Sequence, residues 1–103
     1  MGTLNEGGSN MASTVKRIRA KCQEISDMLV SKNKAYGNSA LEPVRVFAQG
    51  DPEALIRVRL DDKLSRIRNN PTAFGEDPVL DLVGYLVLLL IAREDKAANG
   101  GAA

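Results

Sequence analysis

The stretch from Leu80 to Ala92 constrains the fold of this chain most, because apolar residues occupy most of its positions. It follows Asp77-Pro78, and an acidic residue before a proline is typical of a helix start. A helix that is apolar on all sides must be buried on all sides. The clean run from Leu82 to Ala92 is far shorter than the roughly 18–20 residues that a membrane span needs. We therefore predict a helix from Pro78 to about Glu94 that is buried by other helices and does not lie in a membrane.

Two more helices are predicted upstream. A first helix is expected from about Thr14 to Ser31, because apolar residues recur there at helical spacing. Its stripe consists of Ile18, Cys22, Ile25 and Leu29. Cys22 lies within this stripe, so it is expected to be a small buried side chain. Asp51-Pro52-Glu53 predicts the start of another helix, which ends at about Asn69 before Pro71.

A short additional helix is possible between these two. Ser39 and Glu42 have the spacing of a capping box, and Val44, Val46 and Phe47 could form its apolar side. Pro43 disfavours helix at the residue before it, which argues against this element. The count of helices is therefore three or four.

Both ends of the chain are poor in apolar residues. Residues 1–12 are predicted to be a disordered extension, 13–95 a helical domain and 96–103 a disordered tail. The remaining roughly 85 residues can bury only a small hydrophobic core. The chain has one cysteine and no histidine, so neither an intrachain disulfide nor a Cys/His zinc site can stabilise the domain. We predict an all-α, three- to four-helix bundle that forms an intertwined homo-oligomer in a reducing cytoplasm.

Charge is distributed unevenly along a chain whose net charge is only +1. Residues 56–68 carry five cations and two carboxylates, whereas Glu76, Asp77 and Asp81 follow without a cation among them. Two neighbouring patches of opposite sign fit a small phosphorylated ligand with a divalent ion better than duplex nucleic acid. Without tryptophan, and with two tyrosines and two phenylalanines, the chain is a poor platform for stacking single-stranded bases.

The cations of the second helix lie on both sides of its apolar stripe, which consists of Ile56, Leu60, Leu64 and Ile67. Helical periodicity puts Arg57, Asp61 and Arg68 on one side, and Arg59, Asp62, Lys63 and Arg66 on the other. Guanidinium groups beside a core can line a cleft and bind phosphate through two parallel hydrogen bonds. The alternative is a solvated helix face with the i,i+4 pairs Arg57/Asp61 and Asp62/Arg66.

Asp81 is the most informative polar residue of the third helix. It lies one turn inside an apolar helix, so its carboxylate needs an arginine, a lysine or a metal as partner. An ion pair with Arg57, Lys63 or Arg66 would fix two helices in register. Alternatively, Asp62, Asp77 and Asp81 could hold Mg²⁺, the candidate cofactor, although Asp77 also fits an N-cap. Gly84 indicates a close helix approach.

Three motifs together resemble a known family. They are Lys32-Asn-Lys-Ala-Tyr-Gly-Asn-Ser39, Arg57-Val-Arg-Leu-Asp-Asp-Lys-Leu-Ser-Arg66 and Glu76-Asp-Pro-Val-Leu-Asp-Leu-Val-Gly-Tyr85. In this order they resemble the phage-associated nucleotide modification associated domain family of small helical proteins. The resemblance spans about residues 14–94. It implies a phage-encoded protein with a nucleotide-related role in the host cytoplasm.

Three functions remain open from the sequence. The preferred one is a binding protein that sequesters a nucleotide or cyclic-nucleotide signal. The alternatives are a Mg²⁺-dependent enzyme similar to the all-α nucleotide pyrophosphohydrolases, and an oligomeric interaction protein without a ligand. Tyr36 could stack on a base or simply pack over the helix junction. The candidate ligand-binding residues are Lys34, Tyr36, Asn38, Arg57, Lys63, Arg66, Arg68 and Tyr85.

Overall fold

The computed structural model of this chain describes residues 7–45, 49–70, 72, 75 and 77–100. These residues form three α-helices and no strand. The helices are α1 (Gly7–Ala35), α2 (Pro52–Asn69) and α3 (Pro78–Gly100). The predicted all-α class is confirmed.

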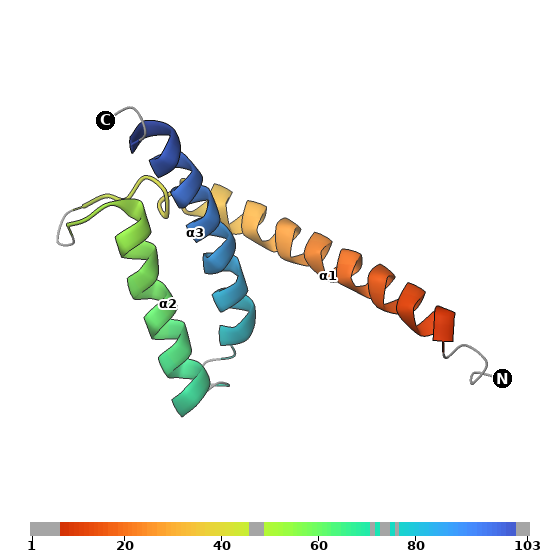
Figure 1. The fold of residues 1–103 in the computed structure, drawn as a ribbon. Helices are drawn as coiled ribbons and strands as arrows, with labels where there is room; N and C mark the ends of the chain where they lie inside the picture. The colour runs from red at the N-terminus through yellow and green to blue at the C-terminus, as the bar shows by residue number, and fades with distance from the viewer. Residues whose placement is uncertain (1–6, 46–48, 71, 73–74, 76, 101–103) are drawn as a thin grey trace.

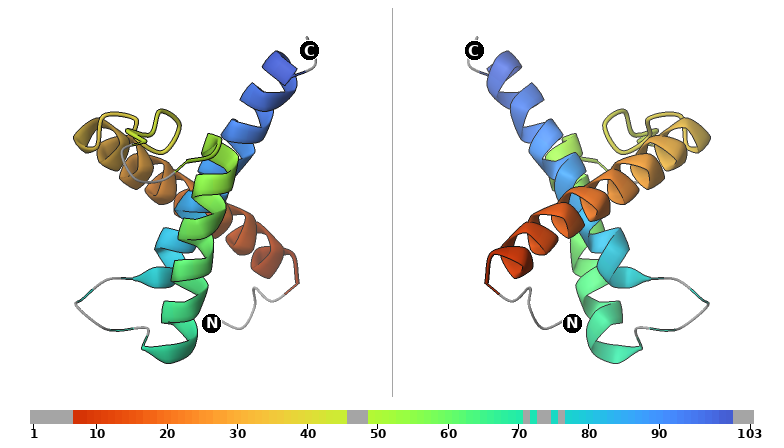
Figure 2. Two further views of the ribbon diagram at one scale, coloured as in Figure 1. Left: turned by 90° about the vertical axis from the view of Figure 1, so that its left-hand side faces the viewer. Right: turned by 90° about the vertical axis from the view of Figure 1, so that its right-hand side faces the viewer.

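α2 and α3 form a helical hairpin, and α1 crosses the outside of α3 (Figures 1 and 2). Only the C-terminal part of α1 lies near α3, while its N-terminal part projects away from the hairpin (Figure 1). The radius of gyration is 17.8 Å. A compact domain of about 100 residues has a radius of gyration near 13 Å. The single chain is therefore extended.

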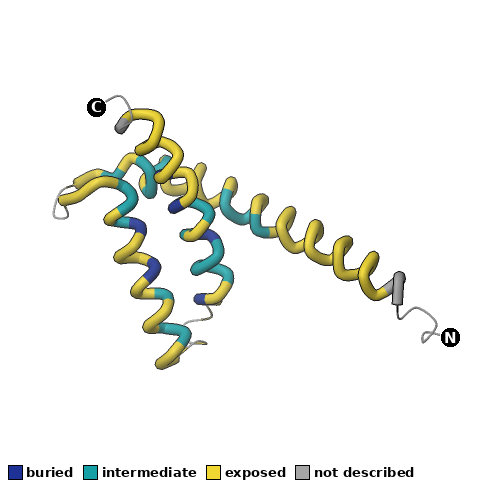
Figure 3. The backbone as a smooth tube through the Cα atoms, viewed as in Figure 1, coloured by how far each residue is buried: buried dark blue, intermediate teal, exposed yellow. Residues whose placement is uncertain are grey.

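The core lies between α2 and α3. Ile56 and Leu60 of α2 are buried against Leu89 and Ala92 of α3. Partly buried residues complete this core: Leu41, Leu82, Tyr85 and Leu88. Figure 3 shows that buried positions face each other across the hairpin, whereas residues 10–24 of α1 are all exposed. The stripe predicted on α2 is thus buried at its first two members, while Leu64 is 52% exposed.

The helix starts predicted from Asp51 and Asp77 are confirmed. Asp51 is the N-cap of α2, where its Oδ1 accepts a hydrogen bond from the backbone amide of Ala54 at 2.8 Å. Asp77 caps α3 in the same way, accepting from the amides of Val79 and Leu80 at 3.1 Å each. Both side chains satisfy amides that lack a partner within the helix.

The outer ends of α1 and α3 lie beyond the predicted ones. α1 begins at Gly7 and ends at Ala35, so residues 7–12 of the expected extension are helical. α3 continues past Glu94 to Gly100, through the first residues of the expected tail. Once a helix exists, each further residue adds a hydrogen bond, and alanines such as Ala97 and Ala98 favour this growth. Residues 1–6 and 101–103 lie outside the described residues.

The possible short helix after Ser39 is not formed over residues 39–45. Gly37 and Asn38 both adopt a positive φ of 63° and end α1. The backbone oxygen of Asn38 then accepts hydrogen bonds from the amides of Leu41 and Glu42, which makes a turn. The last part of the expected helix, including Val46 and Phe47, falls outside the described residues.

The helix crossing explains Gly84. A Cβ atom at Gly84 would lie 2.9 Å from Cδ2 of Leu29 and 3.6 Å from Cε of Met28. α1 therefore approaches α3 closely at this point, as the glycine predicted. The stripe of α1 is covered only here: Ile25 and Leu29 are half-buried, whereas Ile18 is 57% exposed. Cys22 is also exposed in the single chain, so its predicted burial is not provided by the chain's own helices, because no other helix of the described residues reaches that part of α1.

Candidate functional site

One carboxylate joins all three helices. Asp81 of α3 accepts a hydrogen bond from Lys32 Nζ of α1 at its Oδ1, over 3.2 Å. Its Oδ2 lies 3.3 Å from Lys63 Nζ of α2. The side chains of Asp81 and Lys63 are only 13% and 16% exposed, whereas Lys32 is 51% exposed. We call Lys32, Lys63 and Asp81 the junction.

Asp81 keeps its negative charge at the junction. Burial opposes ionisation of this carboxyl, but the hydrogen bonds and charges of Lys32 and Lys63 outweigh it, so that the pKa of Asp81 lies below its ordinary value. Two ammonium groups on one carboxylate leave the junction with a net charge of +1. Lys63 is one of the three partners predicted for Asp81. Lys32 was not predicted, although it begins the first of the three motifs.

Each residue of the junction comes from a different motif. Lys32 opens the first motif, Lys63 lies in the second and Asp81 in the third. The three segments, at residues 32–39, 57–66 and 76–85, are separate in the sequence and meet through side chains at this point. A spacing pattern along the chain could not reveal this meeting, because it depends on where α1 crosses α3.

The other predicted ligand residues are distributed over several parts of the fold. Lys34 and Tyr36 are exposed at the end of α1. Tyr36 is 68% exposed, so it does not pack over the place where the helices meet. Asn38 is half-buried in the turn that follows. Tyr85 packs against the hairpin core. Among the described residues, the structure brings Lys63 of the predicted ligand set into direct contact with Asp81 of the predicted metal set.

The predicted cations of α2 lie along most of its length. Arg57 is 58% exposed and pairs with Glu53, one turn earlier, over 3.0 Å. The alternative of a solvated helix face predicts a pair with Asp61 instead. Arg66 is half-buried one turn after Lys63, and Arg68 is exposed in the last turn. Helical periodicity puts Arg66 on the same side of α2 as Lys63, and Arg57 and Arg68 on the other side.

The predicted metal ligands have separate roles in the described residues. Asp77 caps α3, Asp81 holds two lysines, and Asp62 is exposed on α2. No group of three acidic, cysteine or histidine side chains within the described part of the chain is arranged to hold a metal ion. Glu76, the remaining member of the acidic segment with Asp77 and Asp81, falls outside the described residues.

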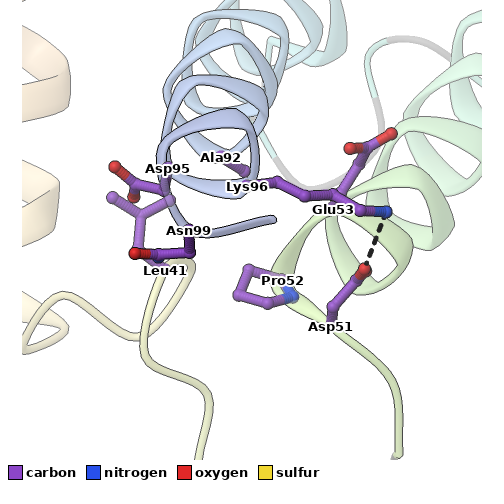
Figure 4. Close-up of a pocket in the computed structure, with 8 residues that line it drawn as sticks. All are labelled: Leu41, Asp51, Pro52, Glu53, Ala92, Asp95, Lys96 and Asn99. Carbon is purple, nitrogen blue, oxygen red and sulfur yellow. Dashed lines mark ion pairs between the residues drawn. The ribbon is translucent and has the colours of Figure 1, made fainter. Parts of the chain in front are cut away.

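A shallow pocket lies at the opposite end of the hairpin from the start of α3 (Figure 4). Its volume is about 290 Å³, and an ion pair of 3.2 Å between Asp51 and Lys96 crosses its mouth. The hydrogen bond from Ala54 and the contact with Lys96 lower the pKa of Asp51. The lining residues are Leu41, Asp51, Pro52, Glu53, Ala92, Asp95, Lys96 and Asn99, none of them a predicted ligand residue.

Comparisons with family models, with curated proteins and with solved structures find no match to this chain. No helix of the described residues combines the length and the apolar character that crossing a bilayer requires. What the chain does must therefore be argued from the junction and from the exposed surfaces of the helices.

Proposed function

We propose that this protein is a homo-oligomeric, phage-type binding protein that sequesters a nucleotide-like ligand in the cytoplasm of the host cell. The observation that carries this proposal is the convergence of the three motifs at the junction. Lys32 and Lys63 share one carboxylate there, and the half-exposed Lys32 presents its ammonium group at the surface. Arg66 lies one turn further on the same side of α2, and its guanidinium suits a phosphate group.

Binding without turnover is favoured over hydrolysis. A Mg²⁺-dependent hydrolase needs carboxylates that are available to the metal. Asp81 already accepts two lysines, and Asp77 accepts two backbone amides of α3. Lys32, by contrast, is half-exposed, and its ammonium group can meet a phosphate while Asp81 keeps its contact with Lys63. Hydrolysis remains the alternative that a Mg²⁺-dependent release of pyrophosphate would establish.

An interaction protein without a ligand is the second candidate. It is favoured by the exposed apolar residues of all three helices, such as Ile18 of α1, Val58 of α2 and Leu90 of α3. Soluble monomers rarely expose large apolar patches, and such patches mark contacts with other proteins. In this case the junction would serve only to fix the three helices in register.

A thermal-shift screen distinguishes these functions. Mono-, di-, tri- and cyclic nucleotides are tested with and without Mg²⁺, and a bound ligand raises the apparent stability by about 2.7 kcal/mol at a hundredfold excess over Kd. Lys32→Ala should weaken binding, because Lys32 is half-exposed and Asp81 keeps Lys63 as partner. The loss of one charged hydrogen bond costs about 1.5–3 kcal/mol of binding free energy.

Lys16→Ala is the matched control for this variant. Lys16 is exposed on the same helix, about 24 Å from Lys32 along its axis. Binding should be unchanged in Lys16→Ala. If no nucleotide shifts the melting temperature of the wild type, the binding function is wrong and the interaction protein becomes the better description.

A further inference from the structure

Two apolar stripes of the chain are uncovered. On α1, Met11, Val15 and Ile18 are 69%, 38% and 57% exposed, and the exposed Cys22 follows them. On α3, Val79, Leu86 and Leu90 are 55%, 44% and 57% exposed, with the half-buried Val83 between them. We call these four-residue sets the α1 stripe and the α3 stripe.

The two stripes have the same spacing. In each, the steps between consecutive members are four, three and four residues, which is the a/d pattern of helices that pack side by side. Both stripes therefore extend over about 17 Å of helix. On α3 the periodicity puts Leu86 and Leu90 on the side opposite Gly84, where α1 of the same chain crosses. The α3 stripe is thus accessible to a second molecule.

The α1 stripe continues a surface that already packs on α3. Leu29 lies one heptad after Cys22 and follows Ile25 in the same pattern, and it contacts α3 at Gly84. The N-terminal part of α1 extends beyond this contact without support from the hairpin (Figures 1 and 3). Most of the stability of a helix in a protein comes from packing of its apolar face. The α1 stripe therefore needs a partner from outside the chain.

Charge selects the partner of the α1 stripe. Residues 16–21 carry four cations, and no acidic residue occurs from Gly7 to Gln23. Two α1 stripes placed together would bring these cations into repulsion. The α3 stripe ends one turn before the exposed carboxylate of Glu94, and the nearby Lys96 is paired with Asp51 over 3.2 Å. A second copy of this chain thus offers a complementary surface on α3.

We propose that the α1 stripe of one copy packs, in parallel, along the α3 stripe of a second copy. This inference rests on the homo-oligomer of the proposed function and names its interface. Aligning Met11 with Val79 puts Cys22 opposite Leu90. In heptad notation Lys21 then occupies position g of α1 and Glu94 position e of α3 in the second copy. Ion pairs between g and e positions determine which helices pair. Lys21 meanwhile pairs with Glu24 of its own helix, and both side chains are more than half exposed and able to exchange partners.

Cross-linking tests the alignment directly. In the variant Leu90→Cys, a short bismaleimide should join Cys22 of one copy to the introduced thiol of another, and peptide mass spectrometry identifies the linked pair. The same variant with Cys22→Ser should lose this product. Predominant linkage between two Cys22 residues in the wild type would show α1-to-α1 pairing and overturn the proposal.

Sedimentation tests the same interface without added thiols. Ile18→Glu and Leu86→Glu should each shift the protein toward monomer while the helical circular dichroism is retained. Val58→Glu is the matched control, because Val58 is 56% exposed on α2 and belongs to neither stripe. Lys21→Glu should weaken assembly at least tenfold, and adding Glu94→Lys should restore it. An oligomer that is unaffected by either stripe variant contradicts this interface alone, whereas a monomeric wild type contradicts the oligomer itself.

Discussion

The junction shows how the surroundings of a single residue determine its role. Asp81 lies in an apolar helix, where an isolated carboxylate would be costly. Lys63 neutralises this carboxylate from a largely buried position, and Lys32 does so from the surface. The two ion pairs therefore contribute unequally to the free energy of unfolding. A half-exposed pair is weakened by solvent screening, whereas a largely buried one is not. We expect the contact with Lys63 to contribute most of the stabilisation.

Replacement of Asp81 tests this account. Asp81→Asn should lower the free energy of unfolding by about 2 kcal/mol at neutral pH, because two charged hydrogen bonds are lost. Urea denaturation at fixed protein concentration measures the change. Glu24→Gln is the control, since Glu24 also accepts from a lysine but is 60% exposed. Its effect should stay below about 0.5 kcal/mol. Equal losses in the two variants would contradict the account.

The lowered pKa of Asp81 also predicts a pH dependence. Its contribution is complete above the pKa of an unfolded aspartate, about 3.9, and is lost as the pH falls through that value toward the lower folded pKa. The wild type should therefore lose stability below about pH 4. Asp81→Asn should lose less over the same range, with Asp51, whose pKa is also lowered, accounting for part of what remains. Parallel stability curves for the two proteins would rule this out.

At the scale of the elements, Gly84 decides how α1 meets α3. The 2.9 Å distance from its ideal Cβ position to Leu29 leaves no room for a side chain unless Leu29 moves. Leu29 Cδ2 is the tip of a flexible side chain, so a single methyl group can be accommodated. A larger side chain would have to displace the backbone of α1.

Two substitutions separate these effects. Gly84→Ala should be nearly neutral, because the gain of about 1 kcal/mol in helix propensity offsets the crowding. Gly84→Leu should cost about 1–3 kcal/mol through overpacking. Thermal denaturation measures both changes, and the added substitution Leu29→Ala should recover part of the loss in Gly84→Leu. If Leu29→Ala fails to recover any stability, the contact does not limit the approach of the helices.

The elements themselves were largely predictable from sequence. Asp51-Pro52 and Asp77-Pro78 begin helices because cap and proline act locally, and these starts were correct. Helix ends were less predictable, since Ala35 and Gly100 lie beyond the last apolar residues of their stripes. The chain's own helices do not bury Cys22, because periodicity identifies an apolar face but not what covers it. Lys32 was missed as a partner of Asp81 for the same reason.

At the scale of the whole molecule, one surface of α3 belongs to the hairpin and another is uncovered. Leu89 is 8% exposed in the core, whereas Leu86 is 44% exposed. These two leucines, three residues apart on α3, allow folding and assembly to be separated by experiment.

The same substitution at these two positions should have different results. Leu89→Glu should unfold the protein, since it puts an unpaired charge into the core. Leu86→Glu should remain folded and become monomeric, as the packing of the hairpin does not use this side chain. Circular dichroism measures folding, and sedimentation measures the mass. Unfolding of both variants would show that assembly and folding cannot be separated in this chain.

The projecting part of α1 is a lever arm whose fulcrum is the contact between Leu29 and Gly84. Met11 lies about 27 Å from Leu29 along the helix axis. A tilt of about 10° at the fulcrum therefore moves Met11 by roughly 5 Å, close to one helical turn. Lys32 lies on the short side of the lever, where it donates a hydrogen bond of 3.2 Å to Asp81. A ligand that draws Lys32 away from Asp81 would thus produce a large displacement at the far end from a small movement at the junction.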